Sequence, residues 1–455
     1  MSTKLAQAYP RKNFFVQMFT KDISLEDCVL DLIDNSVDGF ISSRKLRLSE
    51  IASAIWDKKP AKTVTASLPL IKVSISHAGF EIEDNCGGID LNTALTEVFN
   101  FGHRVGWETE SLGVYGIGLK RALFKLGDHF TITSRTTRNG FHCELPVNEW
   151  VQKDDSPDDW NIPLTEVDAA PSAKVAGTKI TVDRLHSEVE ERLKTGTVEA
   201  SLCRAISTTF CFFLERYVRI TVNGQKVVPL PIPTSKPTRG SVSFERFADD
   251  GVNVRILATI AAQEDPGRYD NSRAGWYVVC NGRTVLSADK SELTGWGTAP
   301  MPLFQPKHRA FVGVVFFESK NPMAMPWTTT KRSLNRESSI YLRTRNRMAV
   351  AAKPVLSFIS KKYPSDSDAE PTEREAAVSQ VIAAPAQLAS ASATLFSVPI
   401  PPPPPRLTQR VQYDARISDL EKVRKHLRQP RMEAGRTGEH TFQYFLEQEG
   451  LASAA

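Results

Sequence analysis

The sequence has few cysteines, and their spacing excludes two common kinds of stabilised fold. The 455-residue chain has six cysteines and no C-x-x-C pair among them. Zinc sites and small disulfide frameworks normally show such paired spacing. We therefore expect all six cysteines to be reduced thiols.

Long apolar runs are also missing. The longest strongly apolar stretch, residues 310–317, is far shorter than the roughly 20 residues that a transmembrane helix needs. Residues 1–22 mix lysine and arginine with short apolar pairs, which is unlike the continuous apolar core of a signal peptide. These patterns predict a cytoplasmic protein without a membrane partner.

The overall charge excess is small. Lys plus Arg number 57 and Asp plus Glu number 52, which gives 57 − 52 = +5, too little to indicate nucleic-acid binding by itself. The hydrophobic fraction of 41% and the charged fraction of 24% are typical of soluble globular proteins and exclude a collagenous or wholly disordered chain. The length predicts two or three folded units.

Proline and composition mark the expected boundaries. Four prolines between residues 229 and 237 interrupt regular structure. After Tyr363 the chain becomes rich in Ala, Ser and Pro and reaches five consecutive prolines, a composition typical of an extended linker. Helical spacing then returns in a short final segment. We predict four parts: an α/β domain at 1–232, a second α/β domain at 233–363, a linker at 364–406 and a small helical module at 407–455.

An acidic stripe is the first candidate for chemistry. Residues 25–40 have the apolar spacing of a helix, and Ser24 with Asp27 has capping-box spacing at its start. Like charges three or four residues apart repel each other, so such a stripe is either solvated or used by a cation or donor. For an isolated amphipathic helix the solvated face is the commoner case. The polar face carries Asp27, Asp31, Asp34, Asn35 and Asp38.

Two glycine-containing motifs follow the stripe. Asp84 ends a predicted strand and precedes Gly87 and Gly88; a carboxylate on an apolar wall suits the exocyclic amine of a purine, although Asp-Asn before glycines is also a common turn. Residues 113–120, GVYGIGLK, lead into an apolar helix. Successive backbone N–H groups and the positive end of a helix dipole bind phosphate oxygens. The loop matches neither Walker A nor the Rossmann fingerprint.

The order of these motifs, followed by Gly-Thr-Lys-Ile at 177–180, resembles the GHKL superfamily of ATPases, which includes gyrase B, MutL, the HtpG chaperone, histidine kinases and MORC proteins. The resemblance covers about residues 14–230. The glycine loop, with Phe101-Gly102-His103 before it, is most similar to the MORC and bacterial MORC-like branch. Residues 14–39 and 433–449 also resemble a group of bacterial ATP-binding proteins. The implied fold class is α/β, a Bergerat-type sandwich.

The resemblance implies ATP and Mg²⁺ as cofactors and assigns roles. Asn35 matches the Mg²⁺ ligand, and Asp31 stands where most relatives have a glutamate general base. Because Asp is one methylene shorter, hydrolysis is expected but slow. Asp84 matches the adenine-binding carboxylate, with Thr178 supporting it through water. Residues 91–112 become the ATP lid. The remaining ATP-binding residues are Asp38, Gly88, Gly113, Gly116, Gly118 and Lys120.

The second domain resembles the transducer domain of gyrase B, MutL and MORC, in which a loop lysine reaches the γ-phosphate. Lys331 is the candidate here, with Arg332 as a second choice; an ordinary surface lysine is equally compatible with the pattern. The segment from Lys331 to Lys362 contains nine lysines and arginines and one glutamate, which gives a net charge of 9 − 1 = +8. Such a segment suits DNA phosphates in a clamp of two protomers, and a solvated helix face packed through residues including Val350 is as good an interpretation.

The expected function is Mg²⁺-dependent ATP binding and hydrolysis coupled to ATP-dependent homodimerisation or clamp closure, with DNA as a candidate partner. A very slow or non-hydrolysing ATP switch is the alternative because of Asp31. Chaperone-like action on a protein client also remains open.

Overall fold

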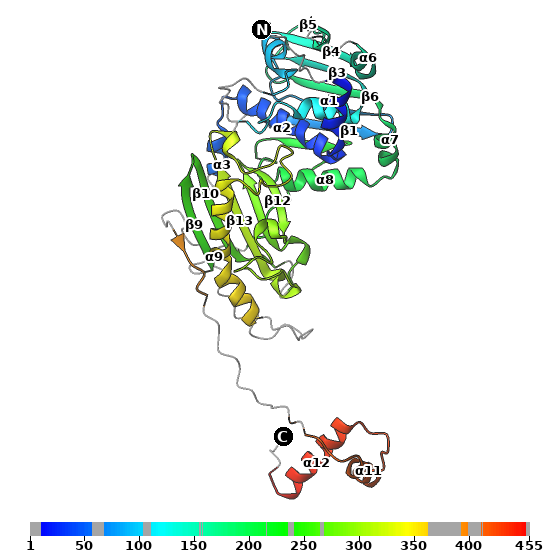
Figure 1. The fold of residues 1–455 in the computed structure, drawn as a ribbon, viewed down its shortest axis with the longest axis vertical. Helices are drawn as coiled ribbons and strands as arrows, with labels where there is room; N and C mark the ends of the chain where they lie inside the picture. Colours follow the sequence, from blue (N-terminus) through cyan, green and yellow to red (C-terminus); the bar gives the residue numbers. More distant parts are fainter. Residues whose placement is uncertain are drawn as a thin grey trace, which may run out of the picture. The chain divides into compact units, whose positions relative to one another are not determined.

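The computed structural model describes residues 11–56, 68–102, 111–153, 156, 158–214, 216–234, 241–263, 268–362, 393–398, 411 and 413–451. The chain divides into two units, Met1–Ile400 and Pro401–Ala455, which are treated separately below. His103, part of the predicted lid and most of the predicted linker lie outside the described residues. Figure 1 shows the elements in chain order.

The first sheet of the larger unit has eight strands in the order β5-β4-β3-β6-β2-β1-β7-β8. Its neighbours pair antiparallel except β1 and β7, which are parallel. The first two strands in the chain, β1 and β2, form a hairpin in the interior of the sheet, and β2 ends at Asp84. The strands are β1 (Leu70–Ser76), β2 (Gly79–Asp84), β3 (Gly127–Arg135), β4 (Gly140–Pro146), β5 (Thr165–Val167), β6 (Gly177–Leu185), β7 (Arg219–Val222) and β8 (Gln225–Lys226).

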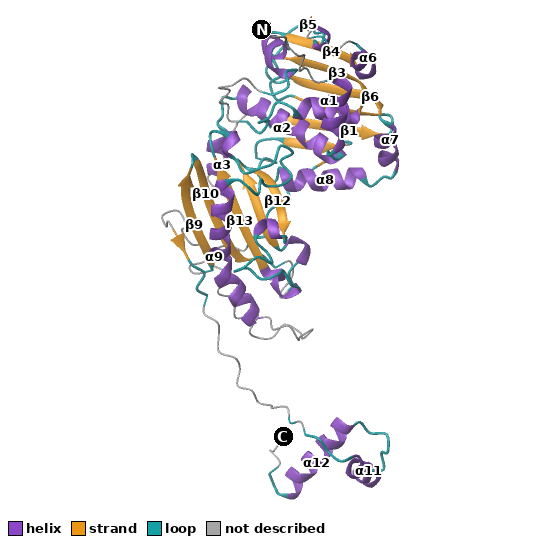
Figure 2. Ribbon diagram, in the orientation of Figure 1, coloured by secondary structure: helices purple, strands orange, loops and turns teal. Residues whose placement is uncertain are grey.

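Helices cover one face of this sheet (Figure 2). Helix α2 begins after Ser24, whose Oγ accepts a hydrogen bond from the Asp27 amide at 3.1 Å. Its apolar face, including Cys28, Val29 and Ile33, is fully buried, so hydrophobic burial fixes which side of α2 faces the sheet. The helices are α1 (Lys12–Lys21), α2 (Leu25–Ser43), α3 (Leu48–Trp56), α4 (Leu91–Thr93), α5 (Gly118–Leu126), α6 (Val147–Gln152), α7 (Ser187–Lys194) and α8 (Val198–Thr209).

A second sheet follows in the order β12-β11-β13-β10-β9-β14. Helix α9 (Ser339–Lys362) packs on it through buried Met348, Val355 and Ile359. The last strand comes from a returning segment, in which Phe396 is buried against Phe358 with ring centroids 5.2 Å apart. The strands are β9 (Val242–Asp249), β10 (Val252–Ile260), β11 (Gly275–Cys280), β12 (Arg283–Asp289), β13 (Phe311–Glu318) and β14 (Ala393–Thr394).

The smaller unit contains α11 (Ile417–His426) and α12 (Ala434–Gln448). Both helices agree with the helical spacing in the sequence. Most of their large apolar side chains are exposed, including Ile417, Tyr444 and Phe445. The two helices therefore bury little apolar surface within the described residues.

The two-sheet α/β architecture confirms the expected fold class, and several local expectations need correction. The apolar spacing of residues 198–217 predicts one helix over that whole range, but helix α8 ends at Thr209 and is followed by turns. Val350 is exposed and does not pack α9. All six cysteines are free, as expected. Within the described residues, no helix has the length and apolarity to cross a bilayer.

Candidate functional site

A cavity of about 290 Å³ opens between α2, the ends of β2 and β6, the glycine loop and the start of α5. Every residue predicted first for a catalytic or ATP-binding role lines it, although these residues come from five separate segments of the chain; Arg332, the second choice beside Lys331, is not among the lining residues. They are Asp31, Asn35, Asp38, Asp84, Gly88, Gly113, Gly116, Gly118, Lys120, Thr178 and Lys331.

The acidic stripe of α2 is partly buried, which excludes the solvated interpretation for its central residues. Asp31 is 3% exposed and Asp34 is 0% exposed. Asp31 Oδ2 accepts a hydrogen bond from Arg121 of α5 at 2.5 Å. A buried carboxylate needs such a partner because desolvation of an unpaired charge is costly. Arg121 was not predicted, since it lies 90 residues from Asp31.

Asp84 is held at the end of β2 by three donors. Ser36 Oγ donates to Oδ2 at 2.7 Å, and the amides of Cys86 and Thr178 donate to Oδ1 at 2.9 and 3.3 Å. Burial raises the pKa of Asp84, while these hydrogen bonds oppose the rise. The Thr178 hydroxyl contacts Ser134 Oγ at 2.8 Å. Ser36 and Ser134 had no sequence signal as supports.

The turn after Asp84 requires glycine at two positions. Gly87 and Gly88 have φ of 115° and 70°, which disfavour any side chain. A Cβ on Gly88 would lie 2.3 Å from the Arg135 carbonyl oxygen. In the GHKL superfamily that the sequence resembles, this motif is usually DxGxG; Cys86 stands at its first glycine and is buried. The positive φ angles fall after Cys86, so this replacement leaves the turn intact.

Asp38 shapes the glycine loop. Its carboxylate accepts hydrogen bonds from Ser111 Oγ and from the Leu112 and Gly113 amides, each at 2.7 Å. Burial raises the pKa of Asp38 to about 6. Gly116 has φ of 63°, again a conformation that favours glycine. The loop entering α5 is thus tied to α2 through one carboxylate.

Lys120 contacts the predicted lid. Its Nζ donates to the carbonyl oxygens of Val98 and Asn100 at 2.9 and 2.5 Å and lies 5.3 Å from the centre of the Phe101 ring. Burial lowers the pKa of Lys120 to about 8. The ammonium therefore joins α5 to the segment after α4, in addition to lining the cavity.

Asn35 is exposed on α2, one turn after Asp31, and lines the cavity. A Cβ on Gly113 would lie 3.2 Å from both Asn35 Oδ1 and Asp38 Oδ2. The glycine therefore keeps the backbone of the loop close to two oxygen-bearing side chains. Oxygen donors of this kind are the ligands that Mg²⁺ prefers.

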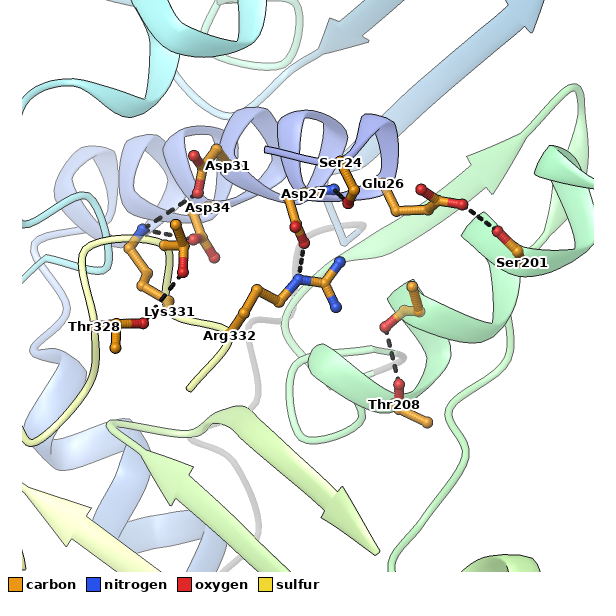
Figure 3. Close-up of polar contacts among 12 residues, drawn as sticks. Ser24, Glu26, Asp27, Asp31, Asp34, Ser201, Thr208, Thr328, Lys331 and Arg332 are labelled. Carbon is orange, nitrogen blue, oxygen red and sulfur yellow. Dashed lines mark hydrogen bonds and ion pairs between the residues drawn. The ribbon is translucent and has the colours of Figure 1, made fainter. Parts of the chain in front are cut away.

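Lys331 enters the site from the loop between β13 and α9. Its Nζ lies 2.7 Å from Asp34 Oδ2 and 3.9 Å from Asp31 Oδ1, and Lys331 is 5% exposed. The ordinary-surface interpretation of Lys331 is therefore wrong. Figure 3 shows Lys331 on the same face of α2 as the Asp27–Arg332 ion pair.

Comparison with known proteins agrees with this geometry. No curated protein matches the chain. Residues 23–176 match the family model described as Histidine kinase-, DNA gyrase B-, and HSP90-like ATPase, and this range contains α2, Asp84 and the glycine loop. Residues 23–176 are therefore similar to this family of ATPases, and the α/β sandwich that they belong to agrees with the match.

Proposed function

We propose that the chain binds ATP with Mg²⁺ in this cavity and hydrolyses it slowly, and that the second sheet responds to the nucleotide through Lys331. The observation that carries the proposal is the position of Lys331, which lines the same cavity as Asp84 and the glycine loop. A cation supplied by a second domain can distinguish the charge of the bound phosphates.

The cavity offers a separate contact for each part of the nucleotide. Asp84, fixed by Ser36 and Thr178, would accept a hydrogen bond from the adenine amine. The amides of the loop and the first turn of α5 would bind the phosphates. Asn35 would supply one oxygen to Mg²⁺, which usually keeps waters and phosphate oxygens as its other ligands.

Asp31 is the proposed general base. Its Oδ2 accepts a hydrogen bond from Arg121 at 2.5 Å, so this oxygen is already occupied by a donor and is not free to accept a proton from water. This ion pair favours the second candidate function, an ATP-gated switch with very slow or no hydrolysis. The two functions share the same binding site and differ only in turnover.

The second α/β domain is proposed to be transducer-like, and ATP binding is proposed to drive homodimerisation, as in the MORC-like branch. The basic segment gives limited support to a DNA clamp. Arg343 pairs with Asp249 and Asp250, and Arg347 pairs with Glu245. These pairs reduce the charge that α9 offers to DNA, so a protein client remains an alternative partner.

Calorimetric titration with a non-hydrolysable ATP analogue, with and without Mg²⁺, tests the binding step. We expect saturable one-site binding that Mg²⁺ strengthens and that Asp84→Asn weakens. Size measurements of the same samples test dimerisation. A folded wild-type chain that binds no adenine nucleotide would refute the proposal.

A further inference from the structure

A buried three-residue cluster lies where the two sheets of the larger unit meet. Asp34 of α2 accepts hydrogen bonds from Arg283 Nε at 2.9 and 3.2 Å and from Lys331 Nζ at 2.7 Å. The side chains of Asp34, Arg283 and Lys331 are 0%, 1% and 6% exposed. Charges so far from water interact strongly, and each depends on the others for neutralisation.

Arg283 binds both partners of the cluster. While its Nε contacts Asp34, its Nη1 donates to the carbonyl oxygen of Lys331 at 2.9 Å. The guanidinium also lies 5.9 Å from the centre of the Phe210 ring. A planar guanidinium with several donors in a fixed fork suits these two contacts, one made through Nε and the other through Nη1.

The backbone of Lys331 is held in an unusual conformation. Its φ is 53°, a left-handed value that is unfavourable for residues other than glycine. The Lys331 amide donates to the Thr328 carbonyl oxygen at 2.8 Å, and Arg283 binds the Lys331 carbonyl. The loop is thus fixed on both sides of the residue whose ammonium enters the cavity.

Asp34 differs from the other acids of α2 in its relation to the cavity. Lys331, Asp31 and Asn35 line the cavity, and Asp34 is not among the described residues that do so. Lys331 therefore contacts a buried carboxylate and also lines the cavity of the proposed phosphate site. A terminal phosphate in the cavity would compete with Asp34 for the same cation.

We propose that Asp34 is a positioning residue that competes with the terminal phosphate for Lys331, and that Arg283 keeps Lys331 at the cavity. Asp34 and Arg283 together thereby set how strongly the site prefers a nucleoside triphosphate to a diphosphate. This inference rests on the proposed function, because it requires nucleotide in the cavity.

The test compares affinities for ADP and for a non-hydrolysable ATP analogue, both with Mg²⁺, by calorimetry on the full chain. Asp34→Asn keeps an acceptor for Arg283 and removes the anion that competes for Lys331. We expect it to increase the preference for the triphosphate by about tenfold, the size of one charge-assisted hydrogen bond. Arg283→Lys keeps the buried charge and loses one of the two contacts, so we expect it to decrease the preference.

Two further variants separate positioning from general damage. In a Lys331→Met background, which itself should lose the preference, Asp34→Asn should have no further effect on it, because the competing cation is gone. Asp27→Asn removes a carboxylate two turns earlier on α2 that pairs with Arg332, and it should leave the preference unchanged. Melting temperatures confirm that each variant is folded. Arg283→Lys carries the test if Asp34→Asn is unstable.

The outcomes distinguish the two levels of the argument. Suppose that Lys331→Met loses the triphosphate preference, whereas Asp34→Asn and Arg283→Lys both change this preference in the same direction or leave it unchanged. The role of Asp34 is then overturned, and the proposed function stands. The role of Asp34 is also overturned if Asp34→Asn changes the triphosphate preference as much in the Lys331→Met background as it does in the wild type. Absence of nucleotide binding by the wild type overturns both.

Discussion

Replacing Asp31 by asparagine separates the hydrolase from the switch. Asn keeps an oxygen that accepts the hydrogen bond that Arg121 donates to Asp31 at 2.5 Å, but it leaves the buried Arg121 cation without its anion. Removing one partner of a buried ion pair typically costs about 3 to 5 kcal/mol. Because one hydrogen bond is kept, we expect Asp31→Asn to lower the free energy of unfolding by about 3 kcal/mol, and a melting temperature checks that the variant is folded.

The kinetic effect should be measurable separately from the loss of stability. A missing general base typically lowers a rate on the order of 10²-fold to 10⁴-fold, while nucleotide binding through Asp84 and the glycine loop should persist. Single-turnover phosphate release measures the rate, and calorimetry with the non-hydrolysable analogue measures binding. Glu26→Gln is the matched control, because Glu26 is on α2 but pairs with Arg192 and Ser201 outside the cavity.

Equal turnover in the wild type and Asp31→Asn would refute Asp31 as the base. Glu26 and Asp34 are the other acids of α2 that the sequence offers as a base, but neither is among the residues that line the cavity. Glu26 forms an ion pair with Arg192, and Asp34 forms ion pairs with Arg283 and Lys331. Turnover that is immeasurably low in both proteins, with intact binding, would instead establish the switch.

Three further predictions address the nucleotide and the partner. Asp84→Asn should weaken adenine nucleotide binding by about 1 to 3 kcal/mol, the cost of mismatched buried polar atoms, and wild-type affinity in a calorimetric titration of the folded variant would contradict this. Affinity should fall as the pH drops through about 6, because the raised pKa of Asp38 means that protonation there removes an acceptor for the Leu112 and Gly113 amides. Titrations of Asp38→Asn between pH 5 and 8 should show a smaller fall in affinity. Some pH dependence should remain, because the pKa of Asp84 is also raised. A pH profile identical to that of the wild type would exclude Asp38 as the cause. If DNA is the partner, replacing the basic residues of α9 by serine should reduce both affinity and its salt dependence, with DNA-free ATP turnover unchanged, and a wild-type salt slope in fluorescence anisotropy would exclude them. Those residues are Arg343, Arg345, Arg347 and Lys353.

The site was more predictable than its supports. The predicted residues form short motifs whose chemistry is local, such as a glycine loop before a helix or an aspartate at a strand end. The ion pairs around them join residues far apart in sequence: 90 positions separate Asp31 from Arg121, and 249 separate Asp34 from Arg283. No periodicity in a single sequence reports such contacts.

The fold shows the same division between local and long-range information. The sequence pattern predicts the hairpin of β1 and β2 at residues 71–82 and the apolar strand β13 at residues 311–317. It does not predict β4 and β9, which are defined by their pairing with strands elsewhere in the chain. The helix predicted to reach residue 217 ends at Thr209. The prediction is too long because the apolar pattern continues after the helix has ended, with Phe210 and Phe213 still buried. Burial preserves the pattern although the helix has ended.

The short strand β14 affects how truncated forms of the chain would behave. Ala393 and Thr394 pair with Glu245 and Phe244 of β9, and the Phe396 amide donates to Ser243 Oγ at 3.1 Å. These contacts occupy part of the backbone edge of β9 and cover apolar side chains beneath it. A truncated protein that ends with α9 would leave this edge bare, and bare edges pair readily with strands of neighbouring molecules. Residues 393–398 therefore act as a built-in guard against aggregation of the second sheet.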